Sequence, residues 1–282
     1  VEYVRPRIFN YSTSYVNPYV SMEYYAYHTV HELFLYGDLT LQQWIDIFNR
    51  IRFVCDDFKR YTVQDANIRQ ALEEMYLTKT LQRFEKMKKD ERFLAFFESP
   101  ITVNGKKYQP LEKIIVALET VIPEMLYDVD TFNIIHGDLC FANIMVDSNF
   151  SFIKVIDPRG KFGTYDIYGD FRYELAKLFH SVDGKYDFII KDLFDLDYNI
   201  ETSCINYRIQ NRKREFNLYK VFLDTFAAEI GNDLRKVELI EALLFLSMIP
   251  LHGESIRHQM VMLGTGLEIL NRVVNIQVEG EK

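Results

Sequence analysis

The sequence predicts an α+β chain that is mostly helical, with a short region of strands at its N-terminus. Residues 1–10 and 15–24 are typical of two β-strands. After residue 28, apolar residues recur every three or four positions over long segments, which predicts helices. The 282 residues are 48% hydrophobic and contain only 12 Gly and 7 Pro. This composition is typical of a packed globular chain with an ample core.

The first helices are predicted by their capping sequences. Thr29 followed by Glu32, and Thr40 followed by Gln43, are capping boxes, in which each side chain satisfies a free backbone N–H group. An apolar stripe over residues 41–58 predicts a helix of nearly five turns. A long, broken helix is expected over 65–97, followed by a hairpin with an Asn-Gly turn over 101–108. Further helices are expected over residues 110–126, 171–181, 212–230, 233–248 and 254–274.

One motif carries the chemistry of the chain. Asp138 follows His136 and Gly137 on a predicted loop, Asn143 comes five residues after Asp138, and Asp157 comes later. Residues 143–147 and 152–156 flank a short turn, so they are predicted to pair as a hairpin. This pairing would bring Asn143 and Asp157 to the same end of the hairpin, where their oxygens can share one metal ion.

These residue types suit phosphoryl transfer. The reaction needs a group that orients the attacking hydroxyl, and hard oxygen ligands that hold Mg²⁺ on the ATP phosphates. Asp138 fits the first role as catalytic base, while Asn143 and Asp157 fit the second as metal ligands. The structural alternative is that Asp138 and Asn143 cap a turn.

The ordered motif resembles the aminoglycoside phosphotransferase and choline kinase family, which has a protein-kinase-like fold. Asp138 and Asn143 match the family's catalytic loop, and Asp157 matches its metal-binding Asp. Two segments depart from the family pattern: residues 158–160 after that Asp, and residues 163–170 before the next helix. The resemblance implies a phosphotransferase that uses ATP and Mg²⁺ and acts on a hydroxyl of a small molecule. The acceptor would be a sugar, an aminoglycoside or an amino alcohol such as choline. One kind of enzyme that fits this resemblance is a bacterial kinase that acts on sugars or on capsule components.

The same resemblance assigns a nucleotide-binding hinge to four consecutive residues: Met22, Glu23, Tyr24 and Tyr25. Backbone groups at this hinge would form hydrogen bonds with adenine. The alternative is that this segment is an ordinary core strand with no role in binding. The implied division is a remnant of the small lobe over residues 1–28 and a helical large lobe over 29–282. A complete small lobe carries a Gly-rich turn and a Lys on its third strand. Neither precedes the hinge here, so we expect either an upstream lobe outside this sequence or the loss of part of the ATP clamp.

Candidate acceptor-binding residues lie after the motif. Arg159 is suited to a phosphate or an anionic acceptor, although pairing with Asp166 explains it equally well. Three polar residues follow a helix break at Pro250: His252, Glu254 and Arg257. They are suited to binding a sugar or a charged head group. The alternative is that they form a helix cap and a cluster of salt bridges.

Charge and cysteine usage exclude several classes of protein. A net charge of −8 and a pI near 5.4 argue against a nucleic-acid partner, because phosphate backbones bind basic faces. Three distant cysteines predict neither a disulfide framework nor a zinc site, and Cys140 is expected to be a small buried thiol. No apolar run is long enough for a membrane span, so a cytoplasmic enzyme is expected. The alternatives are a degenerate kinase-like binding module and a protein kinase, which the Gly before Asp138 disfavours.

Overall fold

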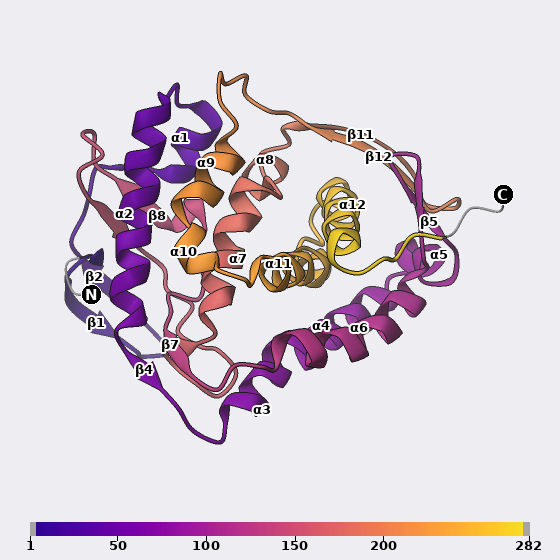
Figure 1. The fold of residues 1–282 in the computed structure, drawn as a ribbon, viewed down its shortest axis with the longest axis horizontal. Coiled ribbons are helices and arrows are strands. Elements are labelled where there is room, and N and C mark those ends of the chain that lie inside the picture. The colour runs from indigo at the N-terminus through magenta and orange to yellow at the C-terminus, as the bar shows by residue number, and fades with distance from the viewer. Residues whose placement is uncertain (1–3, 279–282) are drawn as a thin grey trace.

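The computed structural model describes residues 4–278, which form an α+β fold (Figure 1). Long helices make up the body of this part of the chain, and its strands form four small sheets of two to four strands each. The predicted fold class is therefore confirmed. None of the helices described is both long enough and apolar enough to cross a membrane.

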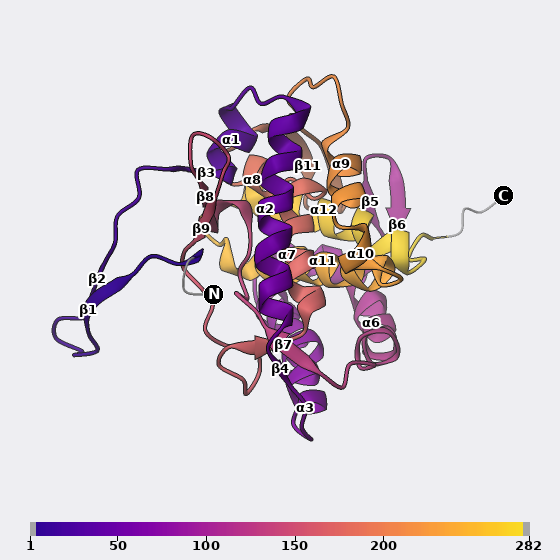
Figure 2. The ribbon, with the colours of Figure 1, turned by 60° about the vertical axis from the view of Figure 1, so that its left-hand side comes forward.

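The N-terminal strands form a hairpin that projects from the helical body (Figure 2). Strands β1 (Ile8–Ser12) and β2 (Tyr19–Met22) pair only with each other in the described chain. An extended segment then leads to β3 (His28–Thr29), which pairs with β8 (Ile144–Val146). Strand β8 pairs in turn with β9 (Ile153–Val155), as the predicted hairpin required.

Both predicted capping boxes are present. Thr29 caps α1 (Val30–Tyr36) and Thr40 caps α2 (Leu41–Lys59), and in each case the third residue of the helix bonds back to the cap. Helix α2 buries its apolar stripe, including Trp44, in the core.

The long helix predicted over 65–97 is broken, as expected. It consists of α3 (Ile68–Leu72), the π-helical segment η2 (Glu73–Thr78), α4 (Lys79–Lys88), the short 3₁₀ helix η3 (Glu91–Phe93) and α5 (Leu94–Glu98). The predicted Asn-Gly hairpin follows as β5 (Ile101–Val103) and β6 (Lys106–Tyr108), and α6 (Leu111–Leu126) follows it.

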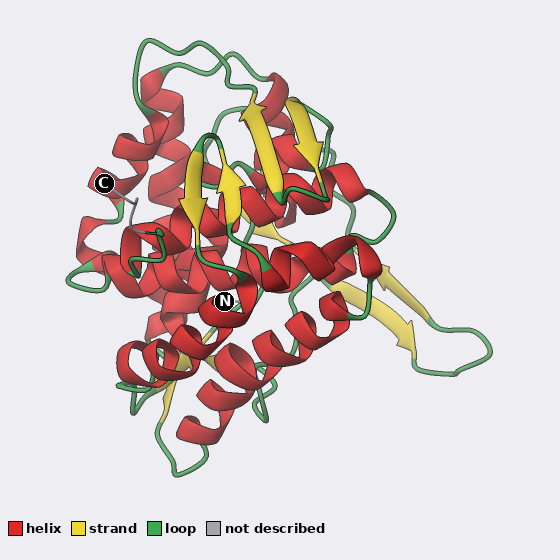
Figure 3. Cartoon of the chain, turned by 90° about the vertical axis from the view of Figure 1, so that its right-hand side faces the viewer, coloured by secondary structure: helices red, strands yellow, loops and turns green. Residues whose placement is uncertain are grey.

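The segment between residues 183 and 230 differs from the prediction. It contains α8 (Tyr186–Ile189) and an unpredicted hairpin of β11 (Phe194–Asn199) and β12 (Cys204–Ile209). Strand β12 pairs in parallel with β5, giving the four-stranded sheet in the order β11-β12-β5-β6 (Figure 3). The predicted helix over 212–230 begins only at α9 (Leu218–Thr225), which α10 (Ala227–Ile230) follows. Arg212 and Arg214 instead donate to backbone carbonyls of α1, and these contacts favour a non-helical segment there.

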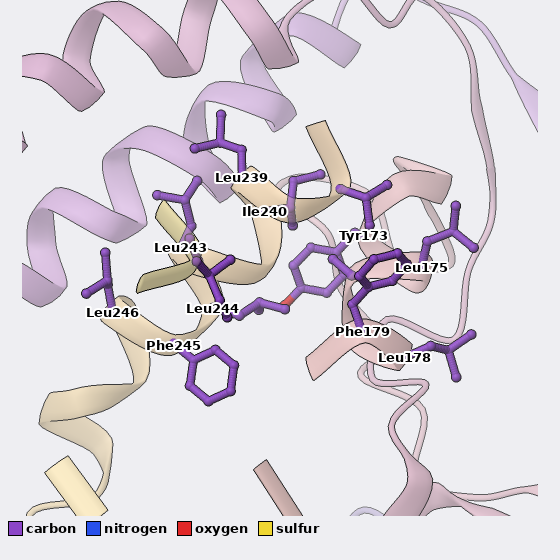
Figure 4. Close-up of a cluster of buried hydrophobic side chains, with 14 of the residues drawn as sticks. Tyr173, Leu175, Leu178, Phe179, Leu239, Ile240, Leu243, Leu244, Phe245 and Leu246 are labelled. Carbon is purple, nitrogen blue, oxygen red and sulfur yellow. The ribbon is translucent and has the colours of Figure 1, made fainter. Parts of the chain in front are cut away.

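Three buried helices form the centre of the molecule: α7 (Phe171–Val182), α11 (Leu234–Met248) and α12 (Ile256–Val273). Figure 4 shows Phe179 of α7 together with Leu243 and Phe245 of α11 in this core. A small sheet in the order β10-β7-β4 lies beside it, made of β10 (Tyr168–Gly169), β7 (Phe132–Ile134) and β4 (Thr62–Val63). Strand β7 leads directly into the motif that contains Asp138.

Candidate active site

Asp138 lies on a loop between β7 and the 3₁₀ turn η4 (Phe141–Asn143), as predicted. Its side chain is 38% exposed, so the carboxylate is accessible to a ligand. The preceding Gly137 has a φ of 75°, and a Cβ there would lie 2.9 Å from the Cβ of Arg159. Only glycine therefore fits at this point of the loop. Burial lowers the pKa of His136, so that its ring is neutral near pH 7.

Asn143 connects the catalytic loop to the β8–β9 hairpin. Its Nδ2 atom donates to the carbonyl oxygen of Asp138 at 2.9 Å and to Asp138 Oδ2 at 3.1 Å. Its own carbonyl accepts a bond from the backbone N–H of Ile156 at 3.0 Å. Asp157 is the next residue, so Asn143 and Asp157 occupy the same end of the hairpin, as the strand pairing predicted.

The free atoms at this end of the hairpin are oxygens. Because Asn143 Nδ2 is used by Asp138, the side-chain Oδ1 of Asn143 is the atom left for a ligand. Asp157 is exposed, has a φ of 59°, and makes no hydrogen bond or ion pair within the described residues. An amide oxygen and a carboxylate are ligands that Mg²⁺ accepts, so the two residues fit this ion.

Helix α7 holds the catalytic loop through polar side chains that the sequence analysis did not assign. Glu174 accepts bonds from the backbone N–H groups of His136, at 2.9 Å, and Gly137, at 2.6 Å. One turn further on, Lys177 Nζ lies 2.8 Å from Asp138 Oδ1. Both residues lie within a helix whose side chains are all buried. The signal was the presence of charged residues in an otherwise apolar helix, but their partner was not visible in the sequence.

Several cations lie near Asp138. Burial is the main cause that lowers the pKa of Lys79 to about 7, and the positive charges of Arg159, Lys177 and Arg83 lower it further. These residues come from α4, α7 and the segment after β9. Within residues 4–278, no hydrogen bond or ion pair joins Lys79 or Arg83 to a carboxylate. The region around Asp138 is therefore rich in basic side chains although the whole chain is acidic.

Arg159 and Asp170 have clear local partners. Arg159 Nη1 donates to the hydroxyl of Tyr173 at 2.7 Å, so the expected alternative partner, Asp166, does not hold it. Asp170 caps α7 by accepting from the backbone N–H of Arg172, which is a structural role.

The polar residues at the break after α11 are divided between two contacts. His252 Nδ1 lies 3.1 Å from Glu254 Oε1, and His252 Nε2 lies 3.4 Å from the hydroxyl of Tyr186. Arg257 is exposed and its guanidinium lies over the ring of Phe194. The role of His252, Glu254 and Arg257 in acceptor binding stays a prediction.

The predicted hinge residues lie in and just after β2. Met22 and Tyr24 are exposed, whereas the Glu23 backbone N–H donates to the carbonyl of Arg7 at 2.8 Å. The ring of Tyr25 packs against Tyr27 and lies under Lys154 of β9. This contact places the end of the segment beside the β8–β9 hairpin, and adenine binding there stays a prediction.

Cys140 behaves as a structural residue. Burial raises the pKa of its thiol to about 11, so it remains protonated at neutral pH.

The comparisons with known proteins find similar solved structures, a glucosamine kinase and a choline kinase among them. No protein-family model and no curated protein matches the sequence. A glucosamine kinase in complex with glucosamine, ADP and inorganic phosphate is similar at a TM-score of 0.44 and 11% identity, over 96% of this chain and 65% of that one. A choline kinase from Cryptosporidium parvum is similar at a TM-score of 0.41 and 11% identity, over 95% of this chain and 73% of that one. Thus the chain spans just under two thirds of the length of the glucosamine kinase. Both matched proteins are kinases of small molecules.

Proposed function

We propose that this chain is the large lobe of a phosphotransferase that moves a phosphoryl group from ATP to a hydroxyl of a small molecule. One observation carries the proposal. Asp138, Asn143 and Asp157 come together at one end of the β8–β9 hairpin, and Asn143 is hydrogen-bonded to both the backbone and the carboxylate of Asp138.

Asp138 is the residue that would orient the acceptor hydroxyl. Lys177 and Asn143 each bind one of its two carboxylate oxygens, which fixes the orientation of the group. Asp138 is therefore suited to positioning the hydroxyl and accepting its proton late, which is the role expected in phosphoryl transfer.

Asn143 and Asp157 would hold Mg²⁺. When bound, this ion would neutralise negative charge on the phosphates. Arg83 and Arg159 add positive charge from the large lobe itself, and Lys79 adds to it when protonated. No Lys precedes residue 59 in this sequence, so every lysine available here comes from after the hinge. Fixed positive charge around a transferring phosphoryl group is a principal source of catalysis for this reaction.

The acceptor is proposed to be a sugar, an aminoglycoside or an amino alcohol. Tyr186 reaches the polar residues at the helix break, where its hydroxyl lies 3.4 Å from His252 Nε2. A hydroxyl group of this kind can bond to a polar acceptor.

A screen of small hydroxylic acceptors tests the proposal. The chain is incubated with Mg-ATP and each acceptor, and the phosphorylated product is detected by mass. We expect a product that depends on Mg²⁺ and is lost in the Asp138→Asn variant. Nucleotide binding without any product across the screen would support a binding module in place of an enzyme.

A further inference from the structure

Three side chains at the break between α11 and α12 converge on one point. His252 and Glu254 lie on the loop after the short helix η5 (Ile249–Leu251), and His258 lies in the first turn of α12. One nitrogen of each histidine and one oxygen of Glu254 lie within 4.8 Å of one another. His252 Nδ1 and Glu254 Oε1 are 3.1 Å apart. In a tetrahedral zinc site, ligand atoms about 2.0–2.1 Å from the ion are separated by roughly 3.3 Å.

Each histidine uses its Nε2 atom for a different partner. His258 Nε2 lies 2.9 Å from Asp192 Oδ1, and His252 Nε2 lies 3.4 Å from the hydroxyl of Tyr186. If each Nε2 carries the proton, each Nδ1 has a free lone pair. A carboxylate that fixes the tautomer of a histidine in this way is the usual outer partner of a metal ligand.

Ion pairing alone does not satisfy this cluster. His258 Nδ1 is buried and has no hydrogen-bond partner within the described residues. If His258 is protonated, it has a buried N–H group without an acceptor, and if it is neutral it has a buried lone pair without a donor. Either state costs free energy, because buried polar atoms are normally paired. A cation at the cluster would use the lone pair of the neutral form.

The backbone holds the three residues in place. Ser255 caps α12 through the backbone N–H of His258, and the backbone N–H of Ser255 donates to the carbonyl of His252 at 3.1 Å. The buried Gln259 donates to the carbonyl of Ile249 at 2.8 Å, which connects α12 to the helix break. The two histidines would therefore lose little conformational freedom on binding.

We propose that His252, Glu254 and His258 bind a divalent transition-metal ion of the Zn²⁺ class, at a site distinct from the Asn143–Asp157 pair. Two imidazoles and a carboxylate suit Zn²⁺, whereas Mg²⁺ prefers oxygen ligands alone. Three protein ligands leave one position for water or an exogenous ligand. The ion would connect the loop at the helix break to α12, and through Asp192 to the turn that precedes β11. The inference does not depend on phosphotransferase activity.

Zinc binding by the whole chain tests the proposal. Protein freed of metal by a chelator is titrated with Zn²⁺ against a chromophoric competitor, with Mg²⁺ in excess throughout. We expect one zinc per chain with a dissociation constant at or below roughly 1 µM. His252→Gln and His258→Gln should each weaken binding by about tenfold or more, and Asp192→Asn by about tenfold, the usual effect of losing an outer partner.

Two variants serve as matched controls. His28 also lies near a glutamate, Glu32, at 3.5 Å, but has no third ligand among residues 4–278, so His28→Gln should leave zinc binding unchanged. Asp157→Ala should also leave it unchanged, because the magnesium site is separate. Circular dichroism verifies folding, and Glu254→Gln, at a mostly exposed side chain, provides the test if a histidine variant does not fold. Absence of bound zinc in the folded protein, or equal affinity in the ligand variants, would overturn the site.

Discussion

The catalytic loop and the N-terminal hairpin, which we predict to face the same nucleotide, are held in very different ways. The loop around Asp138 is bound by Glu174, Lys177 and Asn143, two of them on a buried helix. All residues of β2 are exposed, and β1 and β2 pair only with each other in the described chain. The groups proposed to act on the phosphoryl group are therefore preorganised, whereas those proposed to bind adenine have few supporting contacts.

This difference indicates where substitutions matter most. A preorganised charged group contributes to the transition state because its orientation is fixed before the reaction. An exposed hairpin contributes mainly through backbone hydrogen bonds, each of which has a modest net effect. We therefore expect large effects at the loop and small ones at the hairpin.

The largest effect is expected at Asp138. Asp138→Asn should lower turnover by roughly a hundredfold or more, the scale of a positioned general base, while Mg-ATP binding is retained. Steady-state kinetics and calorimetry measure the two quantities. Asp195→Asn, at an exposed residue of β11, is the matched control. Unchanged turnover in the Asp138 variant would remove the assignment.

The second-largest effect is expected at the two proposed metal ligands, Asn143 and Asp157, and it should differ between them. Asp157→Ala should weaken Mg-dependent nucleotide binding more than Asn143→Ala, since it removes a formal charge. A difference of about tenfold corresponds to roughly 1.4 kcal/mol. Asn143→Ala should in addition lower turnover, because it removes a hydrogen bond to Asp138. Calorimetric titration of Mg²⁺ with ATP tests both, and an equal metal response in the Asp157 variant and the unmodified chain would contradict the role.

Glu174 gives a prediction on pH. Burial raises its pKa to about 7 from an ordinary value of 4.5, even though two backbone N–H groups favour the charged form. Between about pH 4.5 and pH 7 the unfolded chain ionises this group while the folded chain retains the proton. Its contribution to the free energy of unfolding is therefore full at low pH and is lost as pH rises through this window.

The Glu174→Gln variant isolates this contribution. Its free energy of unfolding should fall less than that of the unmodified chain between pH 4.5 and pH 8, by about 3 kcal/mol. Urea denaturation at several pH values gives the difference. Glu112→Gln, on the surface of α6, should match the unmodified chain. Parallel pH profiles for all three proteins would show that Glu174 has an ordinary pKa.

The smallest effect is expected at the hairpin. Tyr24→Pro removes one backbone N–H from the predicted hinge and should weaken ATP binding by about three- to tenfold, the effect of one neutral hydrogen bond. Tyr24→Ala keeps the N–H and should have little effect, because the side chain is 86% exposed. Equal affinity in the two variants would place adenine elsewhere and weaken the comparison between the two regions.

Local sequence determined much of the fold. The capping boxes at Thr29 and Thr40, the Asn-Gly turn at Asn104 and the break at Pro250 all appear where predicted, because each depends on residues a few positions apart. The hairpin that joins Asn143 to Asp157 is of the same kind. Short-range hydrogen bonds and backbone preferences suffice to specify such features.

Only the tertiary structure determined which distant side chains meet. The sequence predicted the helix that contains Glu174 and Lys177, but not that this helix is buried against the catalytic loop. The β11–β12 hairpin was missed because its parallel pairing with β5 joins segments about a hundred residues apart. The meeting of His252, Glu254 and His258 was likewise invisible, since it depends on how the chain turns at the helix break. Packing of the buried helices determines these contacts, and no local pattern records it.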